Sequence, residues 1–192
     1  MTKIAIFASG SGTNAQNIVQ TIGNEIQVTA IYCNNPSAGI IERAQKLGIN
    51  VYLFDRDGLY NTGEVIRHIK QSGAEYVILA GFLWLIPAEL ISYFPDRIIN
   101  IHPALLPNYG GKGMYGNKVH QAVIDNKDEE SGITIHLVNE KYDEGRHLIQ
   151  AKCSVSECDT PDTLAKKIHA LEYEHFPKAI IKYIYENKKK EL

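Results

Sequence analysis

The chain has 192 residues, of which 44% are hydrophobic and 22% charged, and its formal net charge at pH 7 is −2. This length suits one domain with a buried core, and the net charge gives no electrostatic case for nucleic acid or an anionic membrane as a partner. Three cysteines without zinc or redox spacing indicate reduced thiols. With no apolar run of membrane-spanning length and no signal peptide, the sequence predicts a cytoplasmic protein.

Short apolar runs alternate with helical patterns through the first half of the chain. Strands are predicted at residues 3–8, 28–33, 51–54 and 76–80, and helices at about 15–22, 38–47 and 62–72. A further helix follows Gly81, with Pro87 in its first turn. Strands that alternate with helices at this spacing predict a parallel sheet built from βαβ units.

The second half of the chain has a different pattern. It contains a glycine-rich, substrate-facing loop at 109–116, a short helix at about 119–125 and an acidic turn at 128–130. Two strands at 133–138 and 148–155 read as a hairpin. A last helix from about 159 to 185 is expected to kink or break at Pro177, and residues 188–190 are expected to form a frayed basic tail. The predicted fold is a single-domain α/β, Rossmann-like three-layer fold. Its sheet is mostly parallel, with antiparallel strands added near the C-terminal end.

Two polar side chains stand at the end of the apolar strand that begins near residue 98. Asn100 and His102 are separated by one residue, so an extended backbone points both to the same face. Pro103 ends the strand directly after the histidine. An amide and an imidazole therefore project together where a strand ends, which is where open α/β sheets bind ligands. A histidine that only caps a loop would give the same pattern.

Residues 10–15 read Gly-Ser-Gly-Thr-Asn-Ala and match the dinucleotide fingerprint G-x-G-x-x-G/A between a strand and a helix. The glycines let backbone N–H groups approach an anion, and the helix N-terminus favours negative charge. An NAD(P)-binding Rossmann protein is therefore one alternative. Residues 32–35, Tyr-Cys-Asn-Asn, lack the acid that would hold a ribose hydroxyl, which favours a single phosphate. A glycine turn with only a packing role is the other alternative.

A histidine that stabilises charge usually has a carboxylate beside it. Asp143 is a candidate because it lies in a turn that hairpin pairing could return to the sheet edge. The residues alone do not place it above Asp125 or Asp128. None of the other histidines stands at metal-ligand spacing from a Cys, Asp or Glu, so no metal site is predicted.

The glycine loop, the Asn-Ile-His-Pro segment at 100–103 with Leu-Leu-Pro at 105–107, and Asp-Glu-Gly at 143–145 occur in the order found in folate-dependent formyltransferases. The chain resembles this family over nearly its whole length. The glycine loop resembles that of the purine-biosynthetic branch, which transfers the formyl group of 10-formyltetrahydrofolate to the amine of glycinamide ribonucleotide. The resemblance implies small-molecule substrates, 10-formyltetrahydrofolate as cosubstrate, no tightly bound cofactor, no metal, and a monomer or homodimer.

The same resemblance implies one formyltransferase domain over residues 1–192. Its phosphate-binding half would cover about 1–100, and its folate and catalytic half about 80–192. Methionyl-tRNA formyltransferase is an alternative, because it shares the catalytic residues. It differs in carrying a C-terminal RNA-binding domain.

The resemblance also assigns residues to roles. Asn100 and a partly protonated His102 would donate to an oxyanion, while Asp143 would raise the pKa of His102 and accept the proton of the attacking amine. The implied ribonucleotide-binding residues are Gly12, Thr13, Asn14 and Glu172. The implied folate-binding residues are Thr62, Leu83, Trp84, Leu85, Ile86, Asn100, Asn139 and Asp143.

Some of these positions have a second reading or depart from the family. Glu172 could equally lie on a solvated helix face. Trp84 and Thr62 stand where relatives carry arginine, and the loop at 110–116 is longer than in bacterial relatives.

Overall fold

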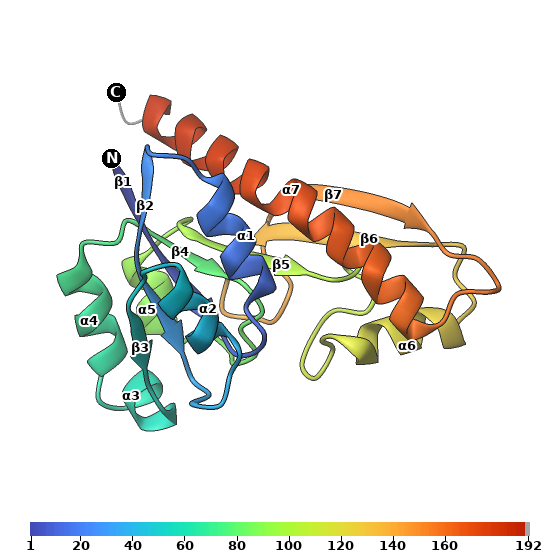
Figure 1. The fold of residues 1–192 in the computed structure, drawn as a ribbon, viewed down its shortest axis with the longest axis horizontal. Helices are drawn as coiled ribbons and strands as arrows, with labels where there is room; N and C mark the ends of the chain where they lie inside the picture. Colours follow the sequence, from blue (N-terminus) through green and yellow to red (C-terminus); the bar gives the residue numbers. More distant parts are fainter. Residues whose placement is uncertain (191–192) are drawn as a thin grey trace. The chain divides into compact units, whose positions relative to one another are not determined.

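The structure is a computed structural model that describes residues 1–190. Seven strands form one sheet in the order β3-β2-β1-β4-β5-β6-β7 (Figure 1). The strands are β1 (Thr2–Ala8), β2 (Ile26–Cys33), β3 (Val51–Leu53), β4 (Tyr76–Leu79), β5 (Ile98–His102), β6 (Glu130–Leu137) and β7 (His147–Ser154). The pairs among β1 to β5 are parallel, and β6 and β7 are antiparallel. The predicted α/β fold class is confirmed.

The helices are α1 (Thr13–Thr21), α2 (Ile40–Lys46), α3 (Arg56–Tyr60), α4 (Glu64–Ser72), α5 (Ala88–Tyr93), α6 (Asn117–Asp125) and α7 (Pro161–Lys190). The short helix α3 was not expected from the sequence. The Asp55 side chain caps it by accepting a hydrogen bond of 2.9 Å from the Gly58 N–H. Pro87 is the N-cap of α5 rather than a residue of its first turn.

Helix α7 corrects two expectations. It continues through Pro177 and includes residues 188–190, so a break at the proline and the predicted frayed tail are both wrong. The alternative expectation, a kink at Pro177, stays a prediction. The proline removes one helical N–H donor. The neighbouring Phe176 and Ile180 are fully buried, and this packing holds the helix together across the proline. The expected acidic turn is also shorter, because Glu130 already begins β6.

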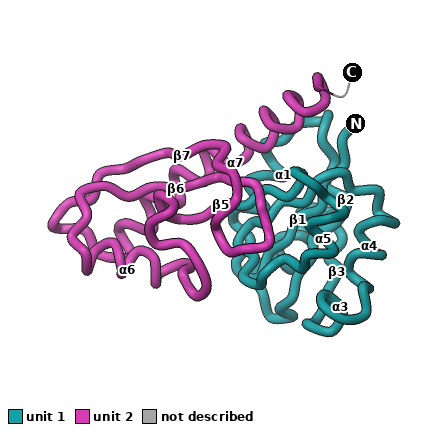
Figure 2. Tube along the Cα trace, turned by 180° about the vertical axis from the view of Figure 1, so that it is seen from behind, with its two compact units in different colours: residues 1–100 teal, residues 101–192 magenta. Residues whose placement is uncertain are grey.

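The chain divides into two compact units, residues 1–100 and 101–192 (Figure 2). In the first unit, the apolar side chains of β1 from Ile4 onward are fully buried, and Phe7 stacks on Tyr32 with 4.9 Å between the ring centroids. In the second unit, α7 packs on α6, β6 and β7 and buries Leu164 and Ile168 completely. Within residues 1–190, no helix combines the length and the apolarity that a membrane span requires.

The β6–β7 pair depends on a glycine. A Cβ atom at Gly132 would collide with the carbonyl oxygen of Ala151 on β7 and would lie 2.7 Å from Leu105 Cδ2. We therefore expect Gly132→Ala to lower the free energy of unfolding by about 1–3 kcal/mol, the usual cost of overpacking. Urea unfolding measures this. Gly10→Ala is the control, because a Cβ there would meet nothing within 4 Å. Equal stabilities of the two variants would contradict the prediction.

Candidate active site

Strand β5 presents the two polar residues that the sequence singled out. His102 is its last residue and is 3% exposed, while Asn100 is half-buried and pairs in register with Leu79 of β4. Extended backbone between them directs both side chains to one face of the strand. Pro103 follows and ends the pairing, as predicted.

Both ring nitrogens of His102 have a defined neighbour. Nε2 lies 2.8 Å from the carbonyl oxygen of Tyr109. Because a carbonyl can only accept, Nε2 must carry the hydrogen and donate it. Nδ1 lies 3.4 Å from Oδ2 of Asp143, so the other side of the ring faces a carboxylate. The structure thus brings His102 and Asp143 together, although they are far apart in sequence.

Asp143 is held by backbone as well as by side chains. Its Oδ2 accepts a hydrogen bond of 2.9 Å from the Gly111 N–H, and its Oδ1 lies 3.7 Å from Nε2 of His136. The other nitrogen of His136 donates to the Leu137 carbonyl at 2.8 Å. Asp143 has a φ of 57°, a conformation that aspartate tolerates better than most residues. These contacts aim the carboxylate at both imidazoles.

Burial sets the protonation of the histidine. It lowers the pKa of His102 below the ordinary value, and the Asp143 carboxylate and the hydrogen bond to Tyr109 raise that pKa only in part. The Asp143 carboxylate thus acts on the His102 pKa in the expected direction, while burial acts against it. The partial protonation of His102 stays a prediction. Burial raises the pKa of Asp143, but His136, His102 and the Gly111 N–H together outweigh it and leave this pKa lowered. The Asp143 carboxylate thus faces an imidazole whose burial disfavours the protonated form, and the pair can take up one proton.

Glu172 lies on α7 and is buried, at 5% exposure, so the solvated-face reading of this residue is wrong. Its Oε2 lies 2.9 Å from Nδ1 of His169, and it raises the pKa of that histidine. Its charge also reaches His102, whose pKa it raises. Nearby on α6, His120 is 2% exposed and its Nδ1 has no hydrogen-bond partner among residues 1–190. The second unit therefore buries several polar groups close to His102.

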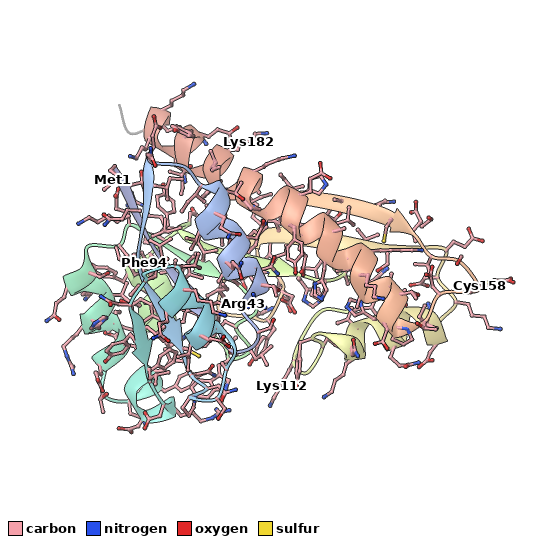
Figure 3. All side chains as sticks on the ribbon, in the orientation of Figure 1. Met1, Arg43, Phe94, Lys112, Cys158 and Lys182 are labelled. Carbon is pink, nitrogen blue, oxygen red and sulfur yellow. The ribbon has the colours of Figure 1, made fainter. Side chains whose placement is uncertain are left out.

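The glycine loop lies in the first unit. Gly12 is the N-cap of α1 with a φ of 77°, and no side chain of the described residues caps this helix. Helix α2 supports the loop, since the Ile40 N–H donates to the Gly10 carbonyl at 3.1 Å and Arg43 Nε donates to the Ser11 carbonyl at 2.9 Å. Arg43 is labelled in Figure 3. A Cβ at Gly12 would collide with the Ile40 side chain. The glycine therefore has a packing reason of its own. Thr13 and Asn14 form the first turn, and their phosphate role stays a prediction.

Four of the eight predicted folate residues lie in an irregular segment between β4 and α5. Leu83 is exposed, Trp84 and Leu85 are half-buried, and Ile86 is buried. Trp84 packs near Tyr60, Phe82 and Phe54, and the Arg56 guanidinium lies 4.7 Å from its ring centroid. The Arg56 cation therefore lies beside the Trp84 ring.

The two remaining folate candidates lie in turns. The Thr62 hydroxyl contacts the Asp57 carbonyl at 3.5 Å. The Asn139 side chain accepts a hydrogen bond of 3.0 Å from the Lys141 N–H. Their folate role stays a prediction.

The structure adds three groups that sequence reasoning missed, namely His136, the Tyr109 carbonyl and the Gly111 N–H. His136 left a signal, because it is a polar residue that interrupts the apolar strand β6 and is 2% exposed. The two backbone groups left none, since any residue carries them. Across residues 1–190, no three His, Cys, Asp or Glu side chains are grouped so that they could hold a metal ion.

Residues 2–180 match the profile of the formyl transferase family. The chain belongs to this family. The family resemblance drawn from the motifs is therefore confirmed, and the reading of the glycine loop as a dinucleotide fingerprint loses its support.

Relatives within the formyl transferase family carry more specific names. The chloroplastic phosphoribosylglycinamide formyltransferase of Arabidopsis thaliana is 43% identical over 182 residues, which cover 90% of this chain and 61% of the relative. The phosphoribosylglycinamide formyltransferase of Bacillus subtilis is 33% identical, with 94% of this chain and 93% of the relative covered. The chain spans about three fifths of the length of two plant relatives. The crystal structure of the enzyme from Bacillus halodurans matches with a TM-score of 0.85 at 33% identity, over 94% of each chain.

The lowered pKa values predict a fold that weakens in acid. A histidine in the unfolded chain titrates near pH 6.5, whereas burial lowers the pKa of His102 in the folded protein. Below about pH 6.5 the unfolded chain therefore binds more protons than the folded protein, and the free energy of unfolding falls. Asp143 lowers the free energy of unfolding further at more acidic pH. This loss begins near the unfolded pKa of about 4 and continues until the pH falls below the lowered pKa of the folded protein. Each such proton adds a slope of about 1.4 kcal/mol per pH unit.

Urea unfolding between pH 7.5 and 5 measures this slope. His102→Gln should reduce it in part, because His120 also has a pKa lowered by burial. His147→Gln is the matched control, since solvent reaches that ring on β7 in the folded protein. An unchanged slope in His102→Gln would contradict the assignment of a buried neutral histidine.

Proposed function

We propose that this chain transfers the formyl group of 10-formyltetrahydrofolate to the amine of glycinamide ribonucleotide, in the purine (IMP) pathway. The observation that carries the proposal is the His102–Asp143 pair, 3.4 Å apart at the end of β5, with Asn100 two positions earlier on the same strand. Membership of the formyl transferase family and the names of the relatives support the same reaction.

The chemistry starts with attack of the substrate amine on the formyl carbon. The carbonyl oxygen then becomes an oxyanion, and preorganised donors aimed at it supply much of the catalysis. The Asn100 amide and the Nε2–H of His102 are these donors in our proposal. The amine loses one proton to the Asp143–His102 pair, and the folate nitrogen gains one proton as its bond to the formyl carbon breaks. The products are the formylated ribonucleotide and tetrahydrofolate, without a covalent enzyme intermediate.

Other residues bind and orient the substrates in this proposal. Gly12, Thr13 and Asn14 would hold the ribonucleotide phosphate with backbone N–H groups at the start of α1. Glu172 would accept hydrogen bonds from ribose hydroxyls. The folate set would comprise Thr62, Leu83, Trp84, Leu85, Ile86, Asn100, Asn139 and Asp143.

We retain the remaining expectations as proposals. These are one formyltransferase domain, no tightly bound cofactor, a monomer or homodimer, and a cytoplasmic location. The two plant relatives are named chloroplastic.

One assay tests the function directly. Purified protein is mixed with glycinamide ribonucleotide and 10-formyltetrahydrofolate, and the release of tetrahydrofolate is followed. Release that requires both substrates supports the proposal. Release that instead requires methionyl-tRNA as acceptor, or no release with either acceptor, would overturn it.

Loss of one oxyanion donor should be costly. Asn100→Ala should lower kcat by about 10²–10³, the range for removing such a donor. Its melting temperature should stay close to that of the wild type, because Asn100 is only half-buried. Asn187→Ala, near the end of α7, is the control and should retain full turnover. Turnover of Asn100→Ala within a factor of two of wild type would show that the residue only caps the loop.

Asp143→Asn keeps the shape of the side chain and removes its charge. The pKa of His102 should fall further below its ordinary value, because the carboxylate now raises it. Turnover should fall by about 10²–10⁴, the usual contribution of a general acid–base group, while both substrates still bind. NMR titration of His102 and single-turnover rates measure the two effects. An unchanged His102 pKa with near-normal turnover would reduce Asp143 to a turn residue.

A further inference from the structure

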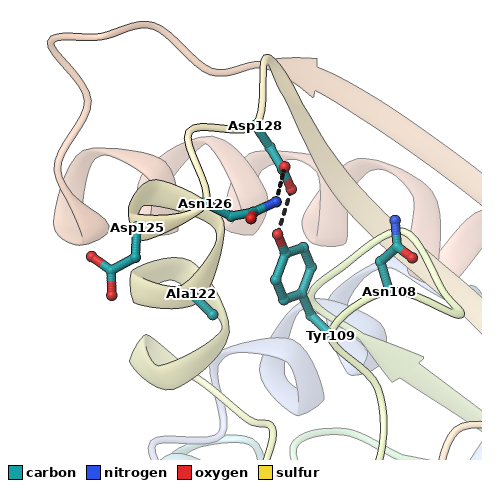
Figure 4. Close-up of a pocket in the computed structure, with 6 residues that line it drawn as sticks. All are labelled: Asn108, Tyr109, Ala122, Asp125, Asn126 and Asp128. Atoms are coloured by element: carbon teal, nitrogen blue, oxygen red, sulfur yellow. Dashed lines mark hydrogen bonds between the residues drawn. The ribbon is translucent and has the colours of Figure 1, made fainter.

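Tyr109 contacts the histidine with its backbone and a distant turn with its side chain. Its carbonyl oxygen accepts the hydrogen of His102 Nε2 at 2.8 Å. Its hydroxyl donates to Oδ2 of Asp128 at 2.6 Å, and the other oxygen of Asp128 accepts from Asn126 Nδ2, also at 2.6 Å. Figure 4 shows the ring extending to this turn between α6 and β6. Tyr109, Asn126 and Asp128 are among the residues that line a pocket of about 690 Å³.

The backbone around Tyr109 is shaped for this contact. Tyr109 has a φ of 56°, a conformation that bulky residues rarely adopt, so the surrounding structure must impose it. The next two residues are glycines. A Cβ at Gly110 would lie 2.7 Å from Leu106 Cδ2 and 3.3 Å from Asp143 Cβ, and Gly111 donates to Asp143. The same turn therefore holds His102 from one side and Asp143 from the other.

The Tyr109 carbonyl opposes a competing arrangement of the hydrogen. A neutral imidazole carries one hydrogen, on either Nδ1 or Nε2. Asp143 faces Nδ1 at 3.4 Å and, as a charged acceptor, would draw the hydrogen to that nitrogen. Nε2 would then have a lone pair and could donate to nothing. The carbonyl at Nε2 stabilises the opposite form.

We propose that Tyr109 is a positioning residue for His102. The Tyr109 hydroxyl is anchored on Asp128, which holds the Tyr109 carbonyl at His102 Nε2 and so keeps the hydrogen on that nitrogen. The catalytic consequence rests on the proposed function, in which this hydrogen is donated to the oxyanion. A negatively charged oxygen is a stronger acceptor than a carbonyl, so it takes the hydrogen bond over as charge develops. Until then the Tyr109 carbonyl keeps the donor in place.

The position of the hydrogen can be measured without turnover. The ¹⁵N chemical shifts of the His102 ring distinguish the two neutral forms, and the wild type should show the hydrogen on Nε2. Tyr109→Phe removes the hydroxyl that reaches Asp128, so a measurable fraction of His102 should move its hydrogen to Nδ1. Tyr185→Phe is the matched control, because it removes a phenol hydroxyl from an exposed ring of α7. Its His102 shifts should equal those of the wild type.

A second experiment measures the kinetics of variants at Tyr109 and at Asp128, the hydrogen-bond partner of its hydroxyl. Tyr109→Phe should lower kcat about 2- to 10-fold, the worth of one hydrogen bond, with KM values little changed. Asp128→Ala should have the same effect, and the double variant should be no worse than either single variant. Asp128→Asn should retain most activity, because an amide oxygen still accepts from the tyrosine hydroxyl.

The outcomes separate cleanly. Unchanged ring shifts in Tyr109→Phe would overturn the proposal, as would additive effects of Tyr109→Phe and Asp128→Ala. A fall in melting temperature with unchanged shifts and kcat would mean a purely structural role and would also overturn it. If the wild type transfers no formyl group but the shifts change as expected, the positioning role stands and the proposed function fails.

Discussion

One hydrogen bond, from His102 Nε2 to the Tyr109 carbonyl, sets what the candidate site can do. It leaves Nδ1 to face Asp143 and a single N–H to face an acceptor. The arrangement requires the backbone to return to His102 at Tyr109, and the glycines at 110 and 111 make that turn possible. The carboxylate, the imidazole and the turn therefore depend on one another, because moving any of them would break a contact of the other two.

The antiparallel strands β6 and β7 hold residues 104–106, the segment between β5 and this turn, by hydrogen bonds. Thr134 on β6 accepts a hydrogen bond of 3.0 Å from the Leu106 N–H and donates one of 2.7 Å to the Ala104 carbonyl. Gln150 on β7 donates to the Leu106 carbonyl at 2.9 Å. These bonds satisfy backbone groups of residues 104 and 106, which have no strand partner because β5 ends before Pro103. The addition of β6 and β7 to a parallel sheet therefore does more than extend it, because it fixes the segment that follows His102.

Charge in the site is controlled by burial. Desolvation is the largest influence on His102, and it exceeds the attraction of Asp143 and the smaller effect of Glu172. The pKa of Asp143 is lowered, because the His136 hydrogen bond, the attraction of His102 and the Gly111 N–H together outweigh its burial. Burial thus favours the neutral form of the imidazole that faces the Asp143 carboxylate. Such a pair has one place for a proton, which is what a reaction that displaces a proton from an amine requires.

The sequence by itself determined the α/β class, the family, and the local pairing of Asn100 and His102, because strand periodicity, glycine spacing and motif order are local properties of the chain. The motifs also pointed to Asp143, although the residues alone could not place it above Asp125 or Asp128. Only the tertiary structure decided that Asp143 meets His102, that Glu172 is buried and that α7 continues through Pro177. The reason is physical: burial and contacts between distant segments depend on packing, and His102 owes its Nε2 partner to a carbonyl that every residue possesses.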